Sequence, residues 1–173
     1  MQNVQPESAQ AQTDSLPSII GQISGMITSD HFPNGDRAAL KRMHPSKEPP
    51  LSFYRFAFRH LPQSWQRQQK AWQTLLTGMA LMSPYIHRPD QPLGKLLADE
   101  HYSEARLERL LAAEGEIRNT LLLRMVRFLA AKKQAVNWVD VAGLLLTCDP
   151  QKRERLHLRI AGDYYKNLKE KEQ

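Results

Sequence analysis

The side chains of this sequence that could act chemically as a group are its arginines and lysines. Three groups recur at helical spacing: Arg37, Lys41 and Arg42; Arg124 and Arg127; and Lys152, Arg155, Arg159 and Lys166. Such lines on rigid helices suit a phosphate backbone, because phosphates recur regularly and a guanidinium can bind them bidentately. Any amphipathic helix also has a solvated charged face, which explains a single line equally well. Several lines on one basic chain favour binding.

No group of residues has the spacing of an active site. The six histidines are isolated, and no two stand three or four residues apart, as metal ligands on one helix face would. Neither a glycine-rich phosphate loop nor a nucleophile elbow is present. We therefore predict a non-catalytic protein with no metal, cofactor or small-molecule substrate. A small hydrolase using Asp99 or Glu100 is the enzymatic alternative. Cys148, at an apolar helix end, is expected to be a buried, inert thiol.

The charge distribution indicates an anionic partner. The 173-residue chain has a formal net charge of +6. Residues 1–30 contain three acidic and no basic residues, which leaves 24 basic and 15 acidic residues, a net charge of +9, on residues 31–173. Nucleic acid or an acidic membrane surface would suit this charge. No apolar stretch approaches the ~18 residues of a membrane span, so we expect no membrane association.

The cysteine content and the N-terminus bear on the compartment. Cys148 is the only cysteine, which fits a reducing environment. The first residues have neither the basic start nor the apolar run of a secretory signal. A cytoplasmic protein is the simplest expectation.

Helical periodicity is the dominant secondary-structure pattern. It predicts helices over residues 16–31, 37–43, 51–61, 64–82, 93–100, 103–112 and 117–133, with two more after Asn137 and Asp149. Asn137 is a candidate N-cap, and Asp149 followed by Pro150 is a strong helix start. A bend or restart is expected near Gly115. No strand pair is visible, so the predicted class is all-α, an irregular helical bundle.

Proline residues divide the chain. Pro84, Pro89 and Pro92 predict a loop over residues 83–92. We therefore expect a disordered tail at residues 1–15, an N-terminal helical lobe at 16–90 and a C-terminal helical lobe at 91–173. The two lobes are expected to pack together.

Several segments carry a family resemblance. Residues 35–42 read GDRAALKR, residues 93–98 read LGKLLA, residues 103–112 read SEARLERLLA, and residues 160–165 read IAGDYY. In this order they resemble motifs of the CasB family, the small subunit of the type I-E CRISPR Cascade complex. The resemblance extends over roughly residues 34–168. Ile160 and Gly162 depart from the Trp and Arg of the family's ending.

The resemblance implies a helical, non-enzymatic subunit present in two copies beside the backbone and large subunits of Cascade. It implies contacts with CRISPR RNA, target DNA and the displaced strand that stabilise the R-loop in antiviral defence, while base pairing supplies sequence specificity. Lys95 and Arg106 join the candidates by position. The candidate nucleic-acid-binding residues are Arg37, Lys41, Arg42, Lys95, Arg106, Arg124, Arg127, Lys152, Arg155 and Arg159.

A second interpretation stays open. The chain could be a helical protein–protein adaptor whose basic faces dock an acidic partner. Such an adaptor would have no affinity for DNA or RNA at low salt, which separates the two interpretations.

Overall fold

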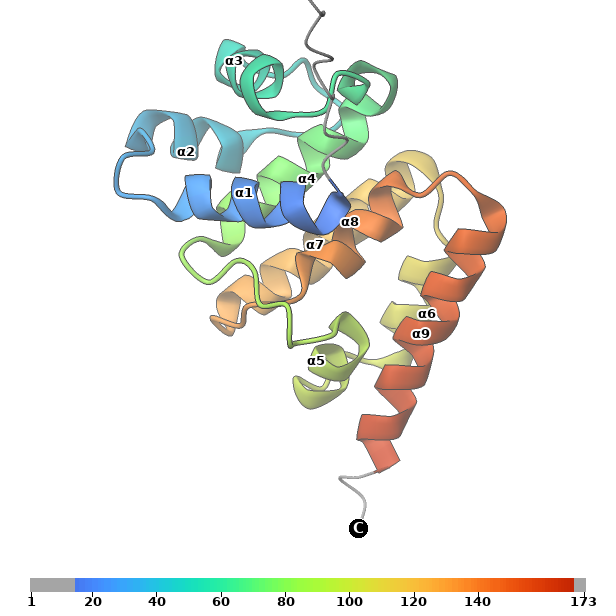
Figure 1. The fold of residues 1–173 in the computed structure, drawn as a ribbon. Coiled ribbons are helices and arrows are strands. Elements are labelled where there is room, and N and C mark those ends of the chain that lie inside the picture. The colour runs from blue at the N-terminus through green and yellow to red at the C-terminus, as the bar shows by residue number, and fades with distance from the viewer. Residues whose placement is uncertain (1–14, 170–173) are drawn as a thin grey trace, which may run out of the picture.

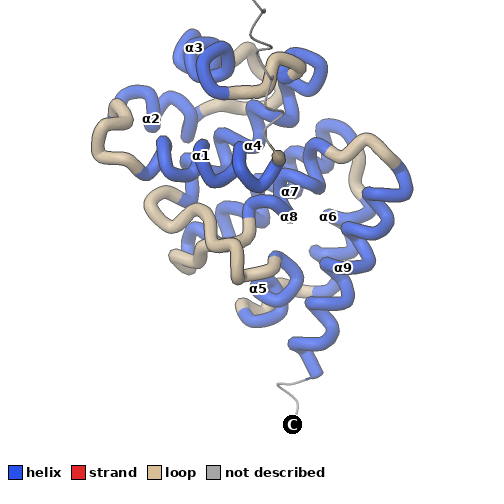
Figure 2. The backbone as a smooth tube through the Cα atoms, in the orientation of Figure 1, coloured by secondary structure: helices blue, strands red, loops and turns tan. Residues whose placement is uncertain are grey.

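The computed structural model describes residues 15–169, and its regular structure is almost entirely helical (Figures 1 and 2). The helices are α1 (Leu16–Thr28), α2 (Asn34–Arg42), α3 (Leu51–His60), a 3-10 turn η1 (Trp65–Gln68), α4 (Gln69–Met82), α5 (Leu93–Asp99), α6 (Glu104–Ala112), α7 (Gly115–Ala131), α8 (Trp138–Leu146) and α9 (Pro150–Lys169). The predicted all-α class is confirmed. The tail predicted for residues 1–15 lies outside the described residues, apart from Ser15.

Several helix ends follow the local signals in the sequence. The Asn137 side chain accepts a hydrogen bond from the Val139 N–H at 3.1 Å, as the cap of α8. Asp149 accepts from the Lys152 N–H at 3.0 Å, and α9 begins at Pro150. Gly115 adopts a φ of +53°, which favours glycine, and there the chain restarts as α7.

Several local predictions were wrong. Helix α1 ends at Thr28 rather than at His31, and α2 begins at Asn34, where a turn before Arg37 was expected. The single helix expected over residues 64–82 begins as η1, because Gln68 leaves the helical region at φ −131° and ψ 37°. The Gln68 amide instead donates to the Leu146 carbonyl at 2.9 Å, a contact that periodicity does not encode. Cys148 is exposed rather than buried, because α8 ends at Leu146 and leaves the thiol in the following loop.

The core surrounds α4, which is buried along almost its whole length and packs against α2, α7 and α8. The three tryptophans predicted to be core, Trp65, Trp72 and Trp138, are all buried. One apolar cluster extends from Ile20 in α1 to Tyr164 in α9. The division into two lobes stays a prediction. Among residues 15–169, no helix is both long and apolar enough to cross a lipid bilayer.

The closest helix packing joins α5 to α9, in the lower part of Figure 1. At Gly94 there is no space for a side chain, because a β-carbon would overlap the carbonyl oxygen of Ile160 and lie 3.0 Å from the β-carbon of Asp163. The backbone of α9 can therefore approach α5 directly. This contact fixes where α9, the longest helix, lies.

Replacing Gly94 with Ala is expected to lower the free energy of unfolding by about 2–3 kcal/mol, because backbone rather than a flexible side chain must move. Gly162→Ala is the matched control. A β-carbon at Gly162 meets nothing within 4 Å, so the change should stabilise α9 by about 0.5–1 kcal/mol. Urea denaturation followed by circular dichroism measures both. Equal effects from the two substitutions would contradict the packing argument.

Candidate nucleic-acid interface

A cleft of about 340 Å³ between α6 and α7 brings basic side chains together. Arg106 and Arg109 are three residues apart on α6 and therefore share a face. Arg124 reaches the same cleft from α7, and Leu121 and Phe128 lie one turn to either side of it. We call this surface the basic cleft. The packing of α6 against α7 creates it, because neither helix carries all three arginines.

An aromatic pair forms one wall of the basic cleft. The rings of Tyr102 and Phe128 meet edge to face with centroids 5.2 Å apart. The Arg106 guanidinium carbon lies 5.9 Å from the Tyr102 ring centroid, which is within cation–π range. Burial raises the pKa of Tyr102, and the charge of Arg106 opposes that shift. The ring therefore stays neutral and supports the guanidinium without using its N–H groups.

The charge in the basic cleft is uncompensated. In the described part of the chain, no carboxylate lies within 4.0 Å of Arg106, Arg109 or Arg124. Three guanidinium groups around one hollow attract anions, and each can donate two parallel hydrogen bonds to a phosphate. The arrangement can hold anions, but it offers no general base or nucleophile.

One further hollow adjoins the basic cleft, and another lies near it across the loop after α2. One of about 340 Å³ shares Leu121 and Arg124 with it and reaches Ser46 in the loop after α2. The other, of about 320 Å³, lies beside this loop and is lined by Arg42 and Lys47. We call the residues along this surface the basic track: Arg42, Lys47, Arg106, Arg109 and Arg124.

Two carboxylates also line these hollows. Glu116 forms an ion pair with Lys70 at 2.8 Å, and this hydrogen bond lowers the pKa of the carboxyl. Its charge is therefore partly neutralised. Glu48 is exposed at the Arg42 end of the basic track. The positive charge is consequently strongest around the basic cleft.

Three of the sequence-predicted residues pair with a carboxylate or with carbonyls at the end of another helix, whereas Arg42 donates only to the Ala38 carbonyl one turn before it, at 3.2 Å. Arg37 donates to the carbonyls of Ile27 at 3.0 Å and Ser29 at 2.9 Å, so it binds the C-terminal end of α1. Lys95 pairs with Asp99 at 2.9 Å along α5.

Arg159, the third of these residues, pairs with Asp140 at 2.6 Å. Asp140 is 3% exposed, and its second oxygen accepts the first N–H of α5, from Leu93, at 3.0 Å. Arg37 and Arg159 therefore connect different helices, whereas the half-exposed Lys95–Asp99 pair lies along one helix and contributes little.

The remaining predicted residues divide by location. Arg106 and Arg124 lie in the basic cleft, and Arg42 lies on the basic track. Lys41, next to Arg42 in sequence, and Arg127, three residues after Arg124, are exposed. Lys152 and Arg155 are exposed on α9 and line none of the hollows of the basic track. Contact with phosphate stays a prediction for all ten residues.

Sequence reasoning missed part of this surface. Arg109 was not a candidate, although its spacing from Arg106 and its place off the Leu107 stripe could have indicated it. Lys47, in a proline-rich loop, carried no such pattern. The roles of Tyr102 and Phe128 depend on how α6 packs against α7, which no local pattern encodes.

A second basic cluster is half-buried between α7 and α9. Burial lowers the pKa of Arg118, and the neighbouring charge of Arg153 lowers it further. The Nε atoms of both arginines are buried with no hydrogen-bond partner among residues 15–169. Burial also lowers the pKa of His157, with smaller contributions from Arg153 and Arg118, so this imidazole is neutral at pH 7.

Comparison with known proteins finds a family that matches most of the chain. Residues 36–165 match the model of a family described as CRISPR-associated protein Cse2. No curated protein matches the chain. The match includes the whole basic cleft and ends within α9.

The partners of Arg159 give a testable distinction between structural and surface arginines. Asp140→Asn should lower the free energy of unfolding by about 2–3 kcal/mol, because a buried carboxylate that accepts two hydrogen bonds is lost. Arg159→Gln should cost about 1–2 kcal/mol, and Arg155→Gln, at an exposed position, less than about 0.5 kcal/mol. Thermal and urea unfolding of the three variants measure this order. A loss for Arg155→Gln as large as that for Arg159→Gln would refute it.

Proposed function

This chain belongs to the CRISPR-associated Cse2 family, and from that premise we propose that it binds nucleic-acid backbone along the basic track. Family membership makes it a subunit of Cascade in CRISPR defence. Within that assembly, the proposed role is to hold phosphates without catalysing a reaction. The observation that carries the proposal is the basic cleft, where three arginines without counter-charges surround one hollow.

The chemistry of the basic cleft favours phosphate over bases. Tyr102 is only 6% exposed, so its ring face is not free for a base to stack on. Contacts to phosphates position a protein without reading sequence. Sequence-independent binding suits an RNA-guided complex, because base pairing with the guide already supplies specificity.

The proposed ligands are the displaced DNA strand and the duplex of CRISPR RNA with target DNA. Neutralising phosphates along either one would stabilise the R-loop, because the separated DNA strand is otherwise free to re-pair. The proposed neighbours are the backbone and large subunits and a second copy of this chain. The adaptor interpretation differs in the ligand: its basic track would dock an acidic protein.

The salt dependence of binding tests the basic track. Full-length protein should bind a single-stranded oligonucleotide with an affinity whose logarithm falls with log salt at a slope of about −3, for about four phosphates. Arg106→Gln/Arg109→Gln/Arg124→Gln should reduce the magnitude of that slope by about 2, at roughly 0.7 per phosphate. Both slopes are obtained by fluorescence anisotropy over a range of about 50 to 300 mM salt.

The matched control is a triple substitution with the same change in charge. Arg59→Gln/Arg67→Gln/Lys166→Gln removes three exposed cations outside the basic track and should leave the slope within about 0.5 of wild type. Equal slope changes in the two triple variants would show that net charge, and not the basic cleft, governs binding. No binding by wild type at low salt would favour the adaptor interpretation.

The assembly itself is tested by co-purification. The tagged chain, expressed with its genomic neighbours, should elute in a large complex containing an RNA of about 60 nucleotides. Elution of the chain alone and free of nucleic acid would contradict the proposal.

A further inference from the structure

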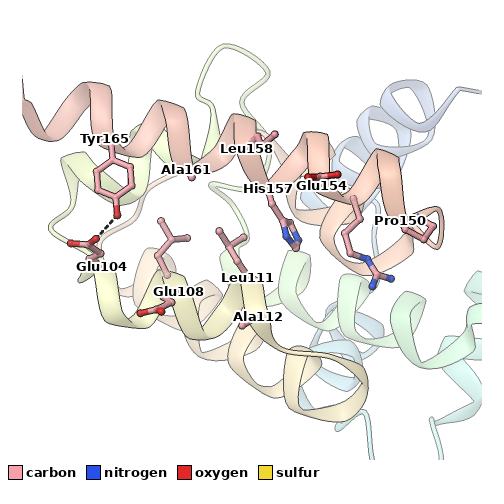
Figure 3. A pocket seen from close by; sticks show the side chains of 12 residues that line it. Glu104, Glu108, Leu111, Ala112, Pro150, Glu154, His157, Leu158, Ala161 and Tyr165 are labelled. Atoms are coloured by element: carbon pink, nitrogen blue, oxygen red, sulfur yellow. Dashed lines mark hydrogen bonds between the residues drawn. The ribbon is translucent and has the colours of Figure 1, made fainter.

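A groove of about 720 Å³ lies between α6 and α9 (Figure 3). The α6 residues that line it differ from Arg106 and Arg109, which line the basic cleft. Its apolar lining comes from both helices and comprises Leu107, Leu111, Ala112, Leu158 and Ala161. Leu158 is 67% exposed, an unusual value for a leucine that faces other apolar side chains. The groove is therefore an apolar surface that this chain leaves uncovered in the part described.

Carboxylates border the groove on a chain that is otherwise basic. Glu104 and Glu108 lie one turn apart on α6, and Glu154 lies on α9 (Figure 3). The Tyr165 hydroxyl donates to Glu104 and connects the two helices at one end of the groove. Within residues 15–169, no cation lies within 4.0 Å of the carboxylates of Glu108 or Glu154.

The opposite end of the groove carries one cation. Arg153 lines this end, donates to the Thr147 carbonyl at 3.1 Å and lies 3.8 Å from the exposed Glu114, so its positive charge is only partly offset. His157 lines the same end and is neutral at pH 7, because burial lowers its pKa. The groove lining therefore holds three carboxylates, from Glu104, Glu108 and Glu154, against one cation, Arg153.

The apolar floor and the acidic rim of the groove indicate which kind of ligand would fit it. Phosphates are repelled by three carboxylates and gain nothing from an apolar floor, so nucleic acid is a poor ligand here. An apolar stripe flanked by lysines or arginines fits both the floor and the rim. The lining of α9 extends from Pro150 to Tyr165, a rise of about 22 Å at 1.5 Å per residue, which matches a helix of about fifteen residues.

We infer that the α6–α9 groove docks a basic amphipathic helix of a neighbouring protein subunit. The inference depends on the proposed function in one respect: the neighbour is another subunit of the same ribonucleoprotein complex. The apolar stripe of the partner helix packs between α6 and α9. The lysines or arginines that flank this stripe pair with Glu108 and Glu154. The groove and the basic track then serve different partners through different residues of α6.

Two synthetic peptides test the chemistry of the groove directly. One is an 18-residue amphipathic helix with a leucine stripe flanked by lysines, and the other has glutamates in place of the lysines. The full-length chain is expected to bind the lysine peptide about tenfold more tightly than the glutamate peptide at physiological salt, by fluorescence anisotropy. Glu108→Lys/Glu154→Lys should reverse this preference. Leu158→Asn, at an exposed position, should weaken binding of the lysine peptide about fivefold.

Asp30→Lys/Asp90→Lys is the matched control, because it reverses two exposed carboxylates outside both the groove and the basic track. It should retain the preference for the lysine peptide. If Glu108→Lys/Glu154→Lys binds the lysine peptide as tightly as wild type does, the inference is wrong.

Assembly of the full complex separates this inference from the proposed function. The Glu108→Lys/Glu154→Lys chain is expected to lose at least about 90% of its co-elution with the other subunits while keeping wild-type affinity for single-stranded DNA. Normal co-elution of this variant would refute the groove but leave nucleic-acid binding intact. Failure of the wild-type chain to bind DNA would refute the proposed function instead. If the charge reversal abolishes self-association in sedimentation velocity, the occupant is a second copy, and the inference of a different subunit is wrong.

Discussion

The buried carboxylate of Asp140 is the interaction on which the arrangement of the C-terminal helices depends. It accepts the Leu93 N–H at the start of α5 and pairs with Arg159 on α9, so one side chain on α8 joins three helices. A buried charge is tolerated only when it is paired and hydrogen-bonded, which makes this geometry obligatory. From α9, the Tyr164 hydroxyl donates to the Tyr102 carbonyl at 2.6 Å. The wall of the basic cleft is thereby connected to Asp140 through α9.

Helix α6 separates two surfaces of opposite charge. Arg106 and Arg109 line the basic cleft, whereas Glu104 and Glu108 line the groove beside α9. A helix with its side chains is about 10 Å across, close to the Debye length of about 8 Å at physiological salt. Each surface therefore presents mainly its own charge to a ligand. A net charge of +6 conceals this division, because it averages over both faces.

The arginines of this protein fall into two groups by their contacts. Arg37 donates hydrogen bonds to backbone carbonyls, and Arg159 donates to a buried carboxylate, so both connect separate helices. Arg109 and Arg124 have no such partner in the described residues and border open hollows. Both kinds occur at helical spacing in the sequence, so spacing alone does not distinguish them. The partner of each guanidinium makes the distinction, and it lies far away along the chain.

The amino-acid sequence by itself determined the helical class, most helix boundaries and the family, because these depend on periodicity and on local signals such as the caps at Asn137 and Asp149. It also indicated a basic surface for binding. Tertiary structure alone decided which cations share that surface: it joined Arg106 to Arg124, added Arg109 and created the acidic groove. The physical reason is the distance along the chain over which each signal acts. A cap or an apolar stripe acts within a few residues, whereas a cleft exists only where two distant helices pack, and their relative position is fixed by contacts such as the buried Asp140 pair.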